Sequence, residues 1–141
     1  MGVLVHPNFD DERVNGVALT RMFYDPTFEG YFINAQLGED MVTNPDGAQT
    51  AKEVLLLQNI DPEKWRPNET VYIRRSSLVA AGETVIEPKD LMEFARQLRR
   101  IQTHFKFLYG RSTDETFAMD VKFKIDRDGQ LAIKQARPWL G

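Results

Sequence analysis

Alternation of apolar and polar residues is strongest at the end of the chain. The segments Phe117–Ile125 and Leu131–Trp139 both alternate, as expected of β-strands with one buried and one solvated face. Between them, Asp128 and Gly129 are typical of the two loop residues of a type I′ hairpin turn. The pattern therefore predicts an antiparallel hairpin.

The two-residue turn determines which residues of this hairpin face one another. It places Lys122 opposite Gln135 and Asp120 opposite Arg137. Parity puts all four side chains on one face, and puts Lys134 among the residues of the other face. An acid, an amide and two cations together would suit a charged ligand, although an ordinary solvated sheet face also carries mixed charge.

Four other segments are predicted to be strands because they are rich in apolar, aromatic or β-branched residues. They are Val3–His6, Val14–Arg21, Gly30–Gln36 and Val71–Ile73. Near the start of the second, the pair Asn15-Gly16 indicates a bulge or a close backbone approach. The run Lys52–Gln58 fits a short helix or a strand equally well.

A single long helix is predicted from Pro88 to Tyr109. Its apolar residues recur at spacings of three and four and form one stripe: Leu91, Phe94, Leu98, Ile101, Phe105 and Leu108. Pro88 suits the first helical turn, and Gly110 suits the position just past the end. Strands followed by one helix and a hairpin predict an α+β fold, in which residues 1–141 form a single domain with a largely antiparallel sheet.

Composition places the chain among ordinary globular proteins. Its 141 residues are 42% hydrophobic and 28% charged, with a net charge of −3, which argues against a nucleic-acid partner. No cysteine occurs, so the sequence predicts no disulfide or thiolate metal site and fits a reducing, cytoplasmic setting. No apolar run approaches the roughly 20 residues of a membrane helix, so we expect no membrane partner.

Two short segments carry candidate chemistry of their own. Glu39 and Asp40 follow Gly38 at the end of a predicted strand, where two carboxylates could contact a metal or a ribose, or form a solvated turn. Thr20 and Arg21 could offer a hydroxyl and a guanidinium to a phosphate, or Arg21 could simply face water. Neither a P-loop nor a dinucleotide-binding glycine motif is present, and two distant histidines give no metal signature.

Three segments together resemble one enzyme family. They are Gly2–Arg21, Gly30–Pro45 and Phe117–Trp139, and the most specific piece is the closing G-x-L-x-x-x-Q-A-R-P. They are similar to the C-terminal half of the ATP-grasp nucleotide-binding domain of phosphoenolpyruvate synthase and pyruvate phosphate dikinase. The resemblance runs in order across nearly the whole chain, with a less distinctive middle.

The resemblance implies a function. In this family the domain binds ATP with Mg²⁺ and phosphorylates a histidine on a separate domain, which carries the phosphate to pyruvate on a barrel domain. By position, Gln135 matches a metal ligand, and Arg137 is the catalytic residue that approaches the phosphates. The residues expected to contact the nucleotide are Thr20, Arg21, Glu39, Asp120, Lys122 and Arg137.

The chain also departs from the family pattern. Lys122 stands where the family usually has Glu, so it brings no oxygen ligand and puts a positive charge opposite Gln135, which argues against Mg²⁺. Met22 stands where Asn or Asp commonly follows Thr-Arg. The N-terminal ATP-grasp half, the phosphohistidine segment and the barrel have no counterpart in 141 residues.

Three interpretations follow from these departures. The first is the ATP-binding part of a larger phosphotransferase that is inactive alone and needs the missing half in cis or in trans. The second is a non-catalytic nucleotide-binding or regulatory domain, in which Lys122 replaces the metal and pairs with Asp120 or with a phosphate. The third is a degenerate fragment that acts only as a protein interface. A divided ATP-grasp domain would also expose apolar surface, which favours self-association.

Overall fold

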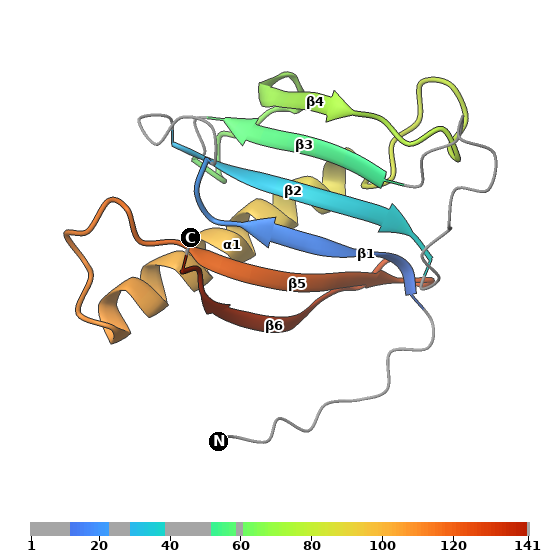
Figure 1. The fold of residues 1–141 in the computed structure, drawn as a ribbon. Helices are drawn as coiled ribbons and strands as arrows, with labels where there is room; N and C mark the ends of the chain where they lie inside the picture. Colours follow the sequence, from blue (N-terminus) through green and yellow to red (C-terminus); the bar gives the residue numbers. More distant parts are fainter. Residues whose placement is uncertain (1–11, 23–28, 39–51, 59–60, 141) are drawn as a thin grey trace.

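The computed structural model describes residues 12–22, 29–38, 52–58 and 61–140. The elements in these ranges are β1 (Glu12–Leu19), β2 (Gly30–Leu37), β3 (Lys52–Gln58), the 3₁₀ helix η1 (Pro67–Glu69), β4 (Thr70–Arg74), α1 (Pro88–Leu108), β5 (Met119–Asp126) and β6 (Leu131–Pro138). The strands form one six-stranded sheet in the order β4-β3-β2-β1-β5-β6, with every neighbouring pair antiparallel. Figure 1 shows α1 crossing behind this sheet. The predicted α+β class is confirmed.

Most predicted elements are present, with bounds that differ by a few residues. The ambiguous run Lys52–Gln58 is a strand, because it pairs with β2 on one side and with β4 on the other. Two of its inward side chains, Leu55 and Leu57, are completely buried apolar residues. The predicted strand Val3–His6 lies outside the described residues.

The core lies between α1 and the inward face of the sheet. Leu91, Phe94 and Leu98 of the predicted helical stripe are at most 1% exposed, and the rings of Phe94 and Phe123 lie 4.3 Å apart between centroids. Full burial of such side chains contributes about 1.5–3 kcal/mol each. The stripe loses contact with the core towards the end of the helix, where Leu108 is 60% exposed.

The predicted helix start is confirmed, and the helix ends at Leu108, one residue before the predicted end. Pro88 is the first residue of α1, where its missing N–H costs no helical hydrogen bond. Gly110 has a φ of 66°, a left-handed conformation that lets the chain leave the helix, and the Arg111 amide then donates to the Lys106 carbonyl at 2.7 Å.

The close backbone approach predicted at Asn15-Gly16 is also present. A Cβ atom on Gly16 would lie 2.1 Å from the Asn34 carbonyl oxygen of β2, so a side chain has no room there. The irregularity in β1 lies slightly earlier, between Glu12 and Val14 in their pairing with β5.

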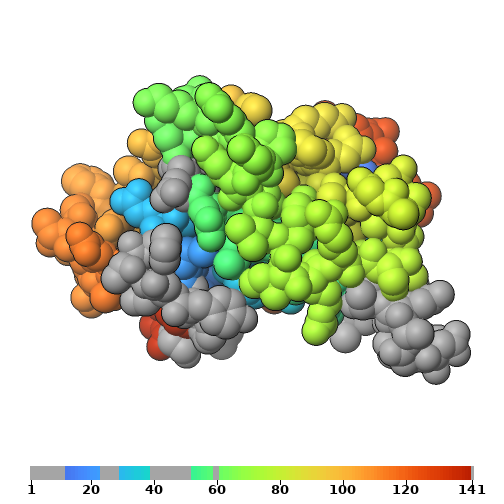
Figure 2. Space-filling model, turned by 90° about the horizontal axis from the view of Figure 1, so that it is seen from above, coloured from blue at the N-terminus to red at the C-terminus, as the bar shows by residue number. Residues whose placement is uncertain are grey.

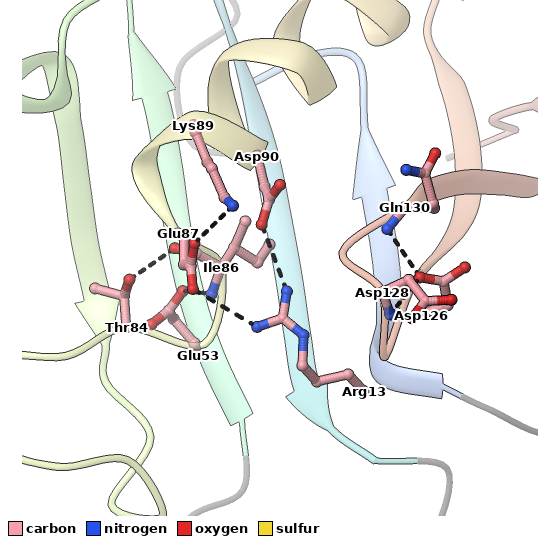
Figure 3. A network of polar contacts seen from close by, with 10 residues as sticks. All are labelled: Arg13, Glu53, Thr84, Ile86, Glu87, Lys89, Asp90, Asp126, Asp128 and Gln130. Carbon is pink, nitrogen blue, oxygen red and sulfur yellow. Dashed lines mark hydrogen bonds and ion pairs between the residues drawn. The ribbon is translucent and has the colours of Figure 1, made fainter.

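A buried carboxylate holds the start of α1 against the sheet (Figure 3). Glu53 of β3 is fully buried and accepts hydrogen bonds from the amides of Val85 and Ile86 at 2.9 and 3.4 Å. Burial raises the pKa of Glu53, and the two amide hydrogen bonds oppose that rise. Arg13 of β1 adds an ion pair to Asp90 in the first turn of the helix, with its Nη2 3.6 Å from Asp90 Oδ2.

The β4 edge of the sheet is flanked by the segment that leads into α1. Figure 2, seen from this edge, shows the green and yellow residues that follow β3 spread across it. On β4 itself, Tyr72 packs against the core, whereas Val71 and Ile73 are 42% and 48% exposed. None of the described helices combines the length and apolar character needed to cross a membrane.

The raised pKa of Glu53 predicts a specific pH dependence of stability. Because the folded state binds a proton more tightly than the unfolded chain, the contribution of Glu53 is largest below its ordinary pKa of 4.5 and falls as pH rises through the raised value. Replacing Glu53→Gln should remove that fall. Urea unfolding of the parent protein and of Glu53→Gln, from acid to neutral pH, measures this effect. The unfolding free energy of the parent minus that of Glu53→Gln should decrease as pH rises.

A contrasting control is Asp114, whose pKa is lowered by hydrogen bonds from the Thr116 hydroxyl and amide. Its contribution has the opposite sign, so it is present at neutral pH and is lost as pH falls through the lowered pKa. Asp114→Asn should therefore change the pH profile in the other direction. A Glu53→Gln difference that stays constant, or grows with pH, would contradict the role assigned to the buried carboxylate.

Candidate functional site

The terminal hairpin has the register that its alternation predicts at the candidate site. Lys122 pairs with Gln135, and Asp120 pairs with Arg137. Met119, Val121 and Phe123 of the same strand are completely buried beneath α1. Since side chains alternate along a strand, Asp120 and Lys122 lie on the opposite face of the sheet, which we call the open face.

This register is reached through a different turn from the one predicted. The loop has three residues rather than two, because the Asp126 amide donates to the Gln130 carbonyl at 3.0 Å. The Asp126 carboxylate also accepts hydrogen bonds from the amides of Asp128 and Gln130 at 2.9 and 2.8 Å (Figure 3). Gly129 takes a φ of 82° at the end of the loop, as a three-residue hairpin requires.

A bulge in β6 offsets the extra loop residue. Phe123 pairs with Ile133, and its neighbour Lys122 pairs with Gln135. Lys134 is therefore the extra residue of the bulge, with no residue opposite it on β5. The prediction that Lys134 lies on the face opposite Lys122 is therefore wrong. At the bulge the alternation breaks, and both lysines line the same pocket.

Asp120 and Arg137 form an ion pair on the open face. Arg137 Nε lies 3.0 Å from Asp120 Oδ2, and the Arg137 side chain is 61% exposed. Asp120 is therefore paired with Arg137 and not with Lys122, although the second interpretation gave Asp120 as one of two partners for Lys122. Lys122 is exposed and has no hydrogen-bond or ion-pair partner within the described part of the chain.

A shallow pocket of about 280 Å³ lies on the sheet over β1, β2, β3, β5 and β6. Its cations are Lys52, Lys122 and Lys134, and its amide side chains are Asn15, Asn34 and Gln36. Lys134 also contacts the buried carboxylate of Glu12, with 2.5 Å between Nζ and Oε1. Three ammonium groups and three amides can donate hydrogen bonds to an anion.

Two of the amide side chains of this pocket are joined by a hydrogen bond. Gln36 Nε2 donates to Asn15 Oδ1 at 3.1 Å, and Asn15 Nδ2 in turn donates to the Gly38 carbonyl. Sequence reasoning missed Lys52, Asn34 and Gln36. Their signal was a polar residue at alternate positions of strands that otherwise carry apolar side chains.

Thr20 lies away from this group, on the α1 side of the sheet. Its hydroxyl accepts a hydrogen bond from the Met119 amide at 2.8 Å and lies 2.5 Å from Gln102 Oε1 of α1. Gln102 in turn donates to the Phe117 carbonyl at 2.7 Å. Thr20 is 5% exposed, so a phosphate contact would require these bonds to break.

The remaining predicted residues are not gathered with the hairpin either. Arg21 follows β1 and donates to the Thr116 carbonyl at 3.1 Å. Met22, where the family pattern has a polar residue, is 5% exposed and packs beside Gly30. Glu39 lies outside the described residues.

The described residues do not fit a Mg²⁺ site. Mg²⁺ takes oxygen ligands, with one or two carboxylates in most protein sites. Gln135 offers one amide oxygen but faces the Lys122 cation, and Asp120 is already paired with Arg137. Across residues 12–22, 29–38, 52–58 and 61–140, no cluster of three or more His, Cys, Asp or Glu side chains could hold a metal ion.

A larger groove of about 640 Å³ runs along the outer side of α1, beside Pro62 and Glu63. It contains the arginines at 96, 99 and 100, but two of them are engaged by carboxylates. Arg96 lies 3.3 Å from Glu63, and Arg99 lies 3.7 Å from Asp61. This groove gathers none of the predicted site residues, so we assign the candidate site to the open face.

Comparison with models of known protein families gives no match, and comparison with curated protein sequences gives none either.

The location of Thr20 predicts what its substitution will do. Thr20→Val keeps the shape but leaves the Met119 amide and the Gln102 carbonyl oxygen without their partner. It should lower the unfolding free energy by about 1–3 kcal/mol, the cost of an unsatisfied buried polar group. Chemical denaturation monitored by circular dichroism measures this.

Thr20→Ser is the matched control, because it keeps the hydroxyl and should retain most of the stability. If Thr20→Val proved as stable as the parent protein, the structural role assigned to the hydroxyl would be contradicted, and the hydroxyl would be available for the predicted phosphate contact.

Proposed function

We propose that this chain supplies the nucleotide-binding face of an ATP-dependent phosphotransferase of the ATP-grasp type. The observation that carries the proposal is the grouping of Lys122, Gln135 and the Asp120–Arg137 pair on two paired strands of the open face. The resemblance to phosphoenolpyruvate synthase and pyruvate phosphate dikinase assigns phosphate and metal contacts to these same positions.

The arrangement suits a polyphosphate. Arg137 is largely exposed and presents a guanidinium, whose planar donors match phosphate oxygens. Lys122 adds a second cation two residues away from Asp120 on β5. In phosphoryl transfer, positioning and charge stabilisation contribute most of the rate, so a cationic sheet face is a useful part of such a site.

The proposal requires a partner. Among the described elements, the helix α1 covers only the opposite face of the sheet (Figure 1), and the exposed Val71 and Ile73 leave apolar surface on the β4 edge. We propose that the other ATP-grasp half covers the nucleotide, in cis or in trans, and that a histidine on a further domain receives the phosphate. In this account Arg137 acts on the transferring phosphoryl group, and the chain alone has no phosphotransferase activity.

A second candidate is a non-catalytic nucleotide-binding domain, and Lys122 is the residue that favours it. A lysine beside Gln135 occupies the position where the family has a carboxylate for the metal. The ammonium can contact a phosphate directly and so take over part of the metal's charge. Such a domain would bind a nucleotide as a regulatory ligand without transferring its phosphate.

Restoring the family's carboxylate tests the proposed site. Calorimetric titration of ATP into the parent protein should give weak binding that Mg²⁺ does not strengthen. In Lys122→Glu, Mg²⁺ should strengthen binding about tenfold, because an added carboxylate and Gln135 can then share the ion with the phosphates.

Lys64→Glu is the control, since it makes the same charge reversal at a side chain that is 85% exposed in the loop beside α1. It should leave the metal response unchanged. If Mg²⁺ changed the ATP affinity of Lys122→Glu and of Lys64→Glu by the same factor, the placement of Lys122 in the nucleotide site would be wrong. Full Mg²⁺-dependent ATP affinity in the parent chain would contradict the need for a second half.

A further inference from the structure

We infer that the open-face pocket binds a polyphosphate directly through Lys52, Lys122 and Lys134, as the free anion and not as its Mg²⁺ complex. This rests on the proposed function only in the choice of a phosphate ligand. It adds two residues, Lys52 and Lys134, that neither the hairpin motif nor the resemblance assigns. The pocket's geometry and charge carry the inference.

Three separate strands bring the lysines together. Lys52 begins β3, Lys122 lies in β5 and Lys134 lies in β6, and all three line one pocket of about 280 Å³. No Asp or Glu is among the described residues that line it. Lys122 and Lys134 lie on the neighbouring strands β5 and β6, and Lys52 lies across β1 and β2 on β3, so an extended anion in the pocket could contact all three ammonium groups.

The bulge in β6 brings Lys134 into the pocket. Without the extra residue, the alternation would turn this side chain to the α1 side of the sheet. The Lys134 ammonium then lies 2.5 Å from the carboxylate of Glu12, whose side chain is 5% exposed. Lys134 is thereby positioned at the pocket by a buried acid instead of moving freely in solvent. Bulges of this kind commonly redirect a side chain at a site.

The floor of the pocket adds hydrogen-bond donors to the cations. Gln36 donates a hydrogen bond to Asn15, and Asn34 lies two residues before Gln36 on β2. Lysine ammonium groups and amide N–H groups both donate to phosphate oxygens. A tripolyphosphate carries enough charge to contact several lysines at once.

Magnesium should oppose this binding. A Mg²⁺ ion on the phosphates neutralises the charge that the lysines attract, and the pocket offers it no carboxylate. The expected effect of Mg²⁺ is therefore weaker binding, the reverse of what a metal-bridged nucleotide site gives.

The test is calorimetric titration of the full chain with sodium tripolyphosphate, with and without equimolar Mg²⁺. The variants are Lys52→Gln and Lys134→Gln, with Lys64→Gln as the matched control outside the pocket. Each pocket variant should raise the Kd about tenfold, and the control should leave it within about twofold. Mg²⁺ should raise the Kd of the parent protein.

Circular dichroism separates loss of binding from loss of fold. This matters for Lys134→Gln because it leaves Glu12 without its ion pair, whereas Lys52→Gln leaves that pair intact. If Lys134→Gln unfolds, Lys52→Gln alone decides the result.

Several outcomes would overturn the inference. They are no detectable tripolyphosphate binding, a Kd unaffected by Lys52→Gln, and binding that Mg²⁺ strengthens. The result also separates this inference from the proposed function. If ATP binds with Mg²⁺ and neither Lys52→Gln nor Lys134→Gln changes that binding, the proposed function is supported and the inference is contradicted. If tripolyphosphate binding depends on the lysines and ATP binds no more tightly than tripolyphosphate, the inference is supported and the proposed nucleotide-binding function is contradicted.

Discussion

The packing of α1 on one face of the antiparallel sheet determines the rest of this structure. Leu91, Phe94 and Leu98 enter the core against the inward residues of the strands, and Phe94 meets Phe123 at 4.3 Å between ring centroids. Once Phe123 is committed to that face, strand alternation turns Lys122 outward. A slip of one residue in β5 would bury Lys122 and expose Phe123, so the same burial energy that holds the helix also presents the candidate site.

The fold could be predicted from the sequence where periodicity is long and well bounded. The helical stripe of α1, with Pro88 at its start and Gly110 past its end, is such a case, and so is the alternation of the terminal hairpin. The run Lys52–Gln58 could not be assigned, because a short apolar segment buried between two strands has no distinct period. Pairing with both neighbours, which is a non-local effect, makes it a strand.

The candidate site was predictable only in part. The pairs at Lys122 and Asp120 are as predicted, but through two departures that cancel: one extra loop residue and one extra residue in β6. The alternation of apolar and polar residues in β6 does not reveal the bulge, so strict alternation places Lys134 on the α1 side of the sheet, which is the wrong face. Thr20 could not be placed by local pattern either, since its partners Gln102 and Met119 lie 82 and 99 residues further along the chain.

Amide chemical-shift mapping by NMR during a tripolyphosphate titration tests the central claim most directly, because it shows which face the anion contacts. Two pockets in the described part of the protein are lined by several cations, one on the open face of the sheet and the other the arginine groove along α1. We expect the largest shifts at Lys122, Lys134 and Gln135, with little change at Arg99 and Arg100. Shifts confined to the arginines of α1 would contradict the assignment of the site to the open face.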